Sequence, residues 1–241
     1  MTPEKSEPVQ ALGDKAVVKT EPAKPARVYP APDPAYFDER RIWAQEFAGQ
    51  LVFGTYHRLF TRLKIEGREN LPPEDTAMVI VGNHKSFYDP PLFQTSTNRK
   101  MVYFAKQELW HNWLLGRILT WLGAVPINRD KPEKSRIKFL IHMMKQGWSL
   151  GMFIEGTRCR LKKKLGRPNV GPAYFARLTK APILPIGFVN TDQRFGPVIV
   201  RIGKLIQPKD DVVATTWEIM DALSELTGYE IAERKLANEK D

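Results

Sequence analysis

Short apolar runs rich in β-branched residues alternate with longer stretches of helical periodicity along most of this 241-residue chain. Such runs are typical of buried strands, and strands separated by helices favour a sheet covered on both faces. Because the chain is long enough for one sizeable core, we expect an α/β fold: a single domain with a mixed, largely parallel sheet covered by helices. The pattern predicts strands at 77–81, 101–105, 124–127, 149–154, 183–188 and 198–202, and helices at 108–122, 132–148, 170–179 and 212–236.

The first 63 residues do not follow this alternation and divide into two parts. Residues 1–34 contain seven of the nineteen prolines, among Lys, Glu and Ala, which predicts a disordered tail. Residues 35–63 carry Trp43, Phe47 and Leu51 at helical spacing and should form an amphipathic helix or helices before the domain. Such a segment fits a helix lying in a membrane interface and equally a helix packed on the core. Basic residues lie near its ends: Arg40, Arg41, Arg58, Arg62 and Lys64.

The segment 82–90, with the sequence GNHKSFYDP, places a histidine five positions before an aspartate. It directly follows the expected strand 77–81, so His84 lies where a strand ends, a common position for a catalytic group. A turn would let the Asp89 carboxylate fold back onto the imidazole, fix its tautomer and leave the other ring nitrogen as a base. A capping aspartate beside a structural histidine explains these two residues about equally well.

Three further segments follow in order: 123–129 (GAVPINR), 153–158 (FIEGTR) and 181–187 (APILPIG). With 82–90 they resemble the motif blocks of the glycerolipid acyltransferases of the 1-acylglycerol-3-phosphate acyltransferase (PlsC-like, HxxxxD motif) family. Those blocks read approximately NHxSxxDP, GxxxxxR, FPEGTR and a Pro-rich strand, and the resemblance extends from about Lys64 to about Pro208. Its clearest departure is Ile154, where the family usually has proline. That change removes a rigid φ angle but no polar group.

The resemblance implies an acyltransferase domain at 64–241, preceded by a membrane-interface segment at 35–63. It implies transfer of a fatty acyl group from an acyl thioester to the sn-2 hydroxyl of 1-acylglycerol 3-phosphate, giving phosphatidate. His84 would be the general base and Asp89 would orient it. The acyl donor would be acyl-CoA or acyl carrier protein, with no bound cofactor and no metal. Another acceptor, such as glycerol 3-phosphate or a lyso-amino-lipid, remains an alternative, as does a non-catalytic basic lipid-binding protein.

The expected substrate-binding residues come mostly from the same motifs. The guanidinium groups of Arg129 and Arg158 match phosphate oxygens bidentately. Gly156 would let backbone amides approach the same anion closely. Glu155 would either pair with one of these arginines or contact the glycerol hydroxyl. The complete set of candidates is Arg129, Glu155, Gly156, Thr157, Arg158 and, after the expected strand 101–105, Lys106.

The net charge of +10 indicates an anionic partner: nucleic acid, lipid headgroups or phosphorylated substrates. The basic cluster at 158–167 has no aromatic residue for base stacking, which disfavours nucleic acid. One cysteine, Cys159, excludes an intrachain disulfide and suits a reducing compartment. No run approaches ~18 apolar residues and no secretory signal opens the chain, so we expect a peripheral protein on the cytoplasmic face of a membrane. The Trp-rich helix 108–122 should lie mostly in the core, with one side lining an acyl-chain tunnel or touching lipid.

Overall fold

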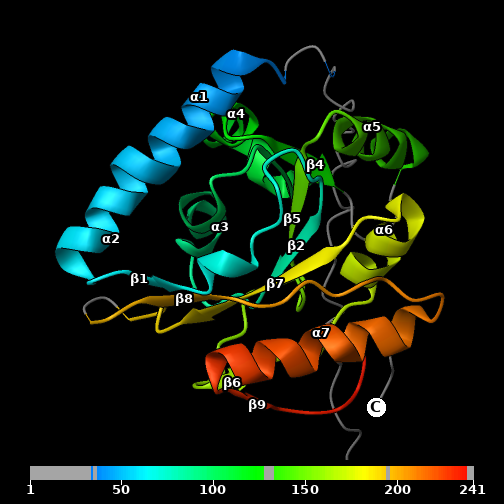
Figure 1. Cartoon of the computed structure of the whole chain (residues 1–241). Helices are drawn as coiled ribbons and strands as arrows, with labels where there is room; N and C mark the ends of the chain where they lie inside the picture. The colour runs from blue at the N-terminus through cyan, green and yellow to red at the C-terminus, as the bar shows by residue number, and fades with distance from the viewer. Residues whose placement is uncertain (1–33, 35–36, 128–132, 194–195, 238–241) are drawn as a thin grey trace, which may run out of the picture.

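A computed structural model describes residue 34 and residues 37–127, 133–193 and 196–237. In this part of the chain, one seven-stranded sheet has the order β1-β8-β7-β2-β5-β3-β4 (Figure 1). All neighbouring strands are parallel except β7 and β8, which are antiparallel. The predicted fold class, α/β with a mixed, largely parallel sheet, is therefore confirmed. The strands are β1 (Lys64–Glu66), β2 (Val79–Gly82), β3 (Met101–Lys106), β4 (Ala124–Ile127), β5 (Ser149–Phe153), β7 (Ile183–Val189) and β8 (Ile199–Ile202).

Helices cover both faces of the sheet because successive residues of a central strand point to opposite faces. Met78 and Ile80 pack in one apolar layer with Phe93 of α3, whereas Val79 and Val81 belong to a second layer. That second layer is completed by residues from α5, α6 and α7. The helices are α3 (Asp89–Thr97), α4 (Trp113–Trp121), α5 (Lys134–Lys145), α6 (Gly171–Thr179) and α7 (Val212–Thr227).

The segment before the sheet forms one long helical run along one side of the molecule (Figure 1). It consists of α1 (Glu39–Glu46), the π-helix η2 (Phe47–Gly54) and α2 (Thr55–Phe60), as the helical prediction for 35–63 required. Asp38 begins it, since its side chain accepts a hydrogen bond from the backbone N–H of Arg41 at 3.2 Å. The expected tail 1–34 lies outside the described residues, apart from Pro34. Within the described ranges, every helix is too short or too polar to cross a bilayer.

Several elements differ from the sequence prediction. The helix predicted at 108–122 starts only at Trp113, where Asn112 caps it, and a 3₁₀ turn, η4 (Gln107–His111), precedes it. The last helix ends at Thr227 rather than 236, because Gly228 adopts a left-handed conformation with φ of 69°. The chain then forms β9 (Glu230–Ile231), which pairs in parallel with β6 (Lys164–Leu165). The helix α3 and the short strands β1, β6 and β9 were not predicted.

The surface of α4 also corrects an expectation. Its large apolar side chains were expected mostly in the core, yet Trp113 is 70% exposed and Trp121 is 54% exposed. Gly116 is its one buried residue. The helix therefore packs through a narrow contact and presents most of its apolar surface outward.

Candidate active site

The loop between β2 and α3 carries His84 and is anchored directly to the sheet. Asn83, fully buried, donates to the carbonyl oxygen of Phe188 at 2.9 Å and accepts from the Phe188 N–H at 2.7 Å. This pair of bonds extends the β2–β7 contact by one residue after β2 ends. His84 therefore leaves the sheet in a fixed direction.

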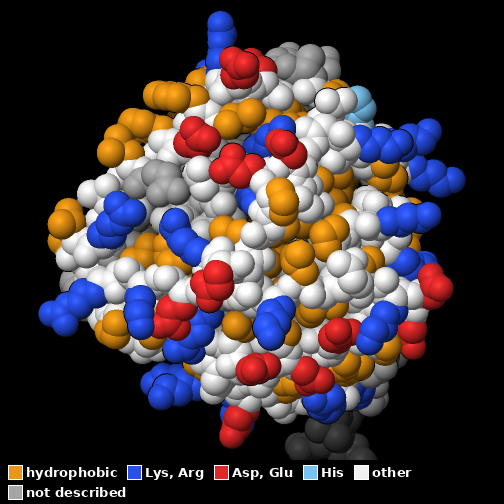
Figure 2. Space-filling view, in the orientation of Figure 1, with side chains coloured by type: hydrophobic (Ala, Val, Ile, Leu, Met, Phe, Trp, Pro, Cys, Tyr) orange, Lys and Arg blue, Asp and Glu red, His pale blue; other side chains and the backbone are white. Residues whose placement is uncertain are grey.

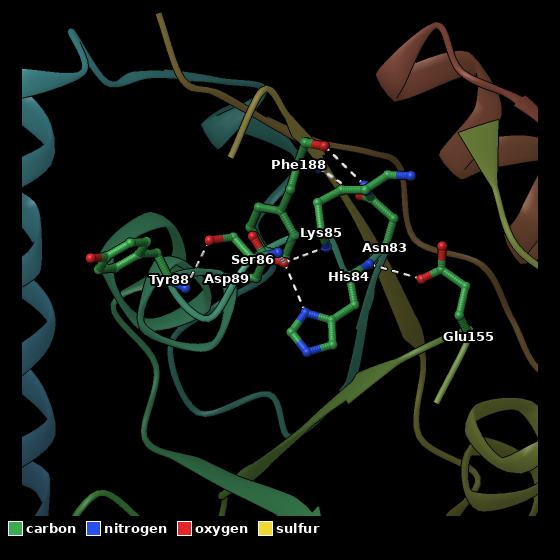
Figure 3. A network of polar contacts seen from close by, with 8 residues as sticks. All are labelled: Asn83, His84, Lys85, Ser86, Tyr88, Asp89, Glu155 and Phe188. Carbon is green, nitrogen blue, oxygen red and sulfur yellow. Dashed lines mark hydrogen bonds and ion pairs between the residues drawn. The ribbon is translucent and has the colours of Figure 1, made fainter. Parts of the chain in front are cut away.

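Asp89 folds back onto this loop from the first residue of α3. Its Oδ2 atom accepts from His84 Nδ1 at 2.8 Å and from the backbone N–H groups of Lys85 at 2.6 Å and Ser86 at 2.7 Å (Figure 3). Pro90 and Pro91 occupy the first helical turn, where no backbone N–H is required. The carboxylate is fully buried, whereas the imidazole retains 16% exposure. From the sequence, capping and orienting the histidine were alternative roles for Asp89. In the structure, its Oδ2 atom does both.

The imidazole is oriented by a second contact as well. Its ring stacks on Phe153, at the end of β5, with 3.9 Å between ring centroids and an interplanar angle of 13°. With Nδ1 donating to Asp89, the neutral ring has its acceptor lone pair on Nε2. Nε2 points away from both neighbouring carboxylates (Figure 3). This geometry suits a general base whose proton acceptor faces a substrate.

Glu155 follows β5 and binds the backbone around His84 rather than an arginine side chain. Its Oε2 atom accepts from the His84 N–H at 2.8 Å, and Oε1 accepts from the Gly166 N–H at 3.3 Å. The His84 carbonyl in turn accepts from the Cys159 N–H at 2.8 Å. Burial raises the pKa of the Glu155 carboxyl from 4.5 to about 7, against the opposing effect of the two N–H donors. Both backbone polar groups of His84 are thus bound by the segment that follows β5.

The same segment brings Arg158 next to the loop that carries His84. Gly156 has a φ of 66°, which turns the chain sharply after the buried Glu155. The guanidinium carbon of Arg158 lies 3.6 Å from the ring centroid of Phe87, a residue of the His84 loop that is 73% exposed. Thr157 is exposed beside it. Arg158 therefore lies next to the histidine loop, as its expected role in phosphate binding requires.

Two other predicted residues are less closely tied to this arrangement. Lys106 is exposed at the carboxyl end of β3, the sheet edge at which β2 and β5 also end. Arg129 lies outside the described residues, so its predicted role stays a prediction. In the described part of the chain, no cluster of three or more His, Cys, Asp or Glu side chains could hold a metal ion.

Lys85 is a residue of the site that sequence reasoning did not single out. Its largely buried amine donates to the carbonyl oxygen of Leu161 at 2.9 Å and to that of Lys164, and it lies 5.4 Å from the ring centroid of Tyr229. It joins the His84 loop to the basic segment 158–167 and to the chain after α7. Because its acceptors are backbone carbonyls far away in the chain, no motif could have revealed this contact.

Three comparisons with known proteins found similar chains. A family model described as "Acyltransferase" matches residues 62–189. A "1-acyl-sn-glycerol-3-phosphate acyltransferase" of Bacillus subtilis is 29% identical over 177 residues, covering 71% of this chain and 87% of the relative. "1-acyl-sn-glycerol-3-phosphate acyltransferase LPAT1, chloroplastic" of Arabidopsis thaliana is 31% identical over 64% of this chain, which spans only 44% of that protein. The crystal structure of PlsC from Thermotoga maritima, titled a 1-acyl-sn-glycerophosphate acyltransferase, has a TM-score of 0.63 and 22% identity, covering 77% of this chain and 78% of its own.

Proposed function

This chain belongs to the acyltransferase family, and we propose that it moves a fatty acyl group from an acyl thioester to the sn-2 hydroxyl of 1-acylglycerol 3-phosphate, giving phosphatidate. The observation that carries the proposal is the hydrogen bond between His84 Nδ1 and Asp89, which directs Nε2 outward from the end of β2. The curated relatives named above support this choice of acceptor, since they carry the name of that activity.

In the proposed reaction, His84 Nε2 removes the proton of the acceptor hydroxyl while that oxygen attacks the thioester carbonyl carbon. The negative charge of Asp89 stabilises the imidazolium that forms and keeps the ring in one orientation. Collapse of the tetrahedral adduct restores the carbonyl and breaks the C–S bond. The leaving thiolate takes the proton from the imidazolium, so His84 ends the cycle neutral. No covalent acyl-enzyme is needed, because the thioester is already activated.

The acceptor phosphate would be bound by Arg158, with Arg129 and Lys106 as further cations of the same site. Arg158 adjoins the histidine loop through Phe87, and Thr157 and Gly156 precede it on the same turn. Glu155 would position His84 through the backbone rather than touch the glycerol. These roles are proposed for the residues of the motif, and each can be tested separately.

We propose a peripheral location on the cytoplasmic face of a membrane, where the lysophospholipid acceptor would reside. The support is the run from α1 to α2, whose side chains Trp43, Phe47, Leu51, Leu59 and Phe60 are 44–71% exposed. Aromatic and aliphatic side chains on one side of a helix with nearby arginines fit the membrane interface.

The reaction is tested by supplying purified protein with a panel of acceptors and both donor types. The panel contains 1-acylglycerol 3-phosphate, glycerol 3-phosphate and lysolipids without a phosphomonoester, each with acyl-CoA or acyl carrier protein. We expect phosphatidate to be the main product. Acylation of glycerol 3-phosphate alone would replace the proposed acceptor, and no acylation of any acceptor would contradict the enzymatic role.

The phosphate role is tested by Arg158→Ala. We expect kcat/KM for 1-acylglycerol 3-phosphate to fall by about 10- to 100-fold, because a bidentate charged contact is worth about 1.5–3 kcal/mol. The KM for the acyl donor should change far less, and Arg158→Lys should restore activity only in part. The exposed Arg177→Ala on α6 is the matched control. An equal loss on an acceptor without phosphate would contradict phosphate binding by Arg158.

A further inference from the structure

We propose that α4 forms, together with α1 and η2, one preformed surface that binds an anionic lipid bilayer; this rests on the proposed function, whose acceptor is a membrane lipid. The observation comes from α4, not from the N-terminal helix alone. Along α4 the exposed fractions are 70% for Trp113, 53% for Leu114, 48% for Ile118 and 54% for Trp121. Contiguous exposed apolar surface of this kind marks an interaction site.

The exposed sides of α4 and α1 meet in one open apolar groove of about 580 Å³. The N-terminal helical run contributes Trp43 and Phe47, whose rings stack with 5.2 Å between centroids. The α4 helix contributes Trp113, Ile118 and Trp121 to the opposite wall. In Figure 2, apolar side chains also gather along the edge of the molecule where the run from α1 to α2 lies in Figure 1. Segments about seventy residues apart in the chain therefore share one apolar surface.

Polar contacts beneath the groove hold the two elements in this arrangement. The buried Gln45 of α1 donates to the carbonyl oxygens of Met101 at 2.6 Å and Leu122 at 3.1 Å, and accepts from the Met101 N–H at 3.0 Å. Arg41 donates to the carbonyl oxygen of Thr120 on α4. Because the backbone of both helices is fixed in this way, the surface exists before any partner binds.

The charge of the groove favours an anionic partner over a second copy of the chain. Arg41 and Arg117 are among the residues that line the groove and its extension, and no carboxylate is among them. A two-fold interface would bring the cations of two copies together without an acid to compensate them. Tryptophan and arginine side chains are both suited to the boundary between acyl chains and headgroups. A bilayer with anionic headgroups satisfies both the apolar area and the charge.

This surface also reaches the catalytic loop. Tyr56 of α2 stacks on Tyr88, with 5.6 Å between ring centroids, and Tyr88 directly precedes Asp89. Phe87, on the same loop, is 73% exposed. A bilayer lying on the helical run would therefore be close to the loop that carries His84, from which the acceptor would enter.

The test is vesicle binding by the full chain carrying Trp113→Glu and Trp121→Glu. Binding is measured by co-sedimentation with phosphatidylcholine vesicles and with vesicles that also contain phosphatidylglycerol. The control carries Leu178→Glu and Val213→Glu, which change two exposed apolar residues on α6 and α7, outside the groove. We expect at least tenfold weaker binding to the anionic vesicles for the α4 variant and less than twofold change for the control. Circular dichroism verifies that both variants are folded.

If the double variant does not fold, the single change Arg117→Glu provides a second test of vesicle binding. It should weaken binding to anionic vesicles several-fold and leave binding to neutral vesicles nearly unchanged. Wild-type binding by a folded α4 variant would overturn the proposal, as would a stable dimer in solution that these changes dissociate. Acylation of detergent-dispersed 1-acylglycerol 3-phosphate is measured in parallel. The α4 variant should retain this acylation activity. If the wild type acylates no acceptor at all, the proposed function is contradicted, but the vesicle-binding result still stands.

Discussion

A single oxygen atom, Asp89 Oδ2, both closes the turn after β2 and orients the imidazole of His84. The two backbone N–H donors fix the carboxylate whether or not the histidine is present, so the loop does not depend on the imidazole. The imidazole, by contrast, depends on the carboxylate for its tautomer and on Phe153 for its plane. Changes at His84 and Asp89 should therefore have different effects on stability although both impair catalysis.

For His84→Ala we expect kcat to fall by about 10²–10⁴-fold, because a positioned general base contributes that much. The melting temperature should change little, since Asp89 retains its two backbone donors. Asp89→Asn should lower activity too. It should also lower the unfolding free energy by about 1–3 kcal/mol, because the two backbone N–H groups would then donate to a neutral amide instead of a charged carboxylate. Steady-state kinetics and thermal denaturation measure both quantities. The exposed His142→Ala on α5 is the control, and near-normal turnover by His84→Ala would contradict the mechanism.

The buried carboxyl of Glu155 predicts a specific dependence of stability on pH. Burial raises its pKa from 4.5 to about 7, so between these values the folded protein binds more protons than the unfolded chain. Its contribution to stability is therefore complete below pH 4.5 and is lost as the pH rises to about 7, a change of about 3 kcal/mol. Chemical denaturation at intervals across this pH range measures it.

The variant Glu155→Gln does not titrate, so its difference from the wild type isolates this contribution. We expect the unfolding free energy of the wild type to fall more steeply with rising pH than that of the variant. The exposed Glu69→Gln should give the wild-type curve. Parallel curves for wild type and Glu155→Gln would show that the carboxyl does not titrate in this range.

At the scale of elements, strands and helices with a strong local signal were predicted well. The run before His84 is apolar and short, so β2 and the loop after it could be placed from sequence. The helix α3 was not predicted, although the two prolines after Asp89 fit the start of a helix. The end of α7 carried a usable signal in Gly228, but the apolar residues beyond it extended the predicted helix too far. The strand β1 has only three residues, too few for a periodicity.

What the sequence could not provide is the partner of each apolar or polar surface. The periodicity of α4 shows that one side is apolar, but not whether protein or solvent covers it, and the core assignment was wrong for this reason. The same limit applies to Lys85 and Glu155, whose partners are backbone groups brought near by the fold. Motif residues indicate which reaction a site can catalyse. The backbone contacts of Lys85 and Glu155 depend instead on where distant segments of the chain lie in the fold.

The basic loop at 158–167 behaves as an element whose position depends on Lys85. We expect Lys85→Met to raise the KM for the phosphorylated acceptor several-fold, because the loop that carries Arg158 loses two carbonyl contacts. The unfolding free energy should fall by about 1–3 kcal/mol, since two partly buried backbone carbonyls lose a charged donor. Lys85→Arg should restore part of the acceptor affinity, and the exposed Lys138→Met on α5 is the control. Lower stability with an unchanged acceptor KM would mean that Lys85 has a structural role only.

At the scale of the whole molecule, charge and apolar surface should act together on a membrane. The chain carries a net charge of +10, and part of it lies in exposed side chains such as Arg160, Lys162 and Lys163. The groove between α1 and α4 supplies apolar area at a different place. Charge should therefore govern the strength of attraction to anionic vesicles, whereas the apolar surface should govern the binding that remains when charge is screened.

This division predicts how salt changes the affinity of the full chain. Raising the salt from about 0.1 M to about 1 M shortens the screening length from ~10 Å to ~3 Å, so binding to anionic vesicles should fall by more than about tenfold. Binding to neutral vesicles should change little over the same range. Deleting residues 1–34 should alter neither result by more than about twofold, because that segment has equal numbers of acidic and basic residues. A tail deletion that abolishes binding to both vesicle types would assign the membrane contact to the tail, and would contradict the view that helices of the folded domain provide it.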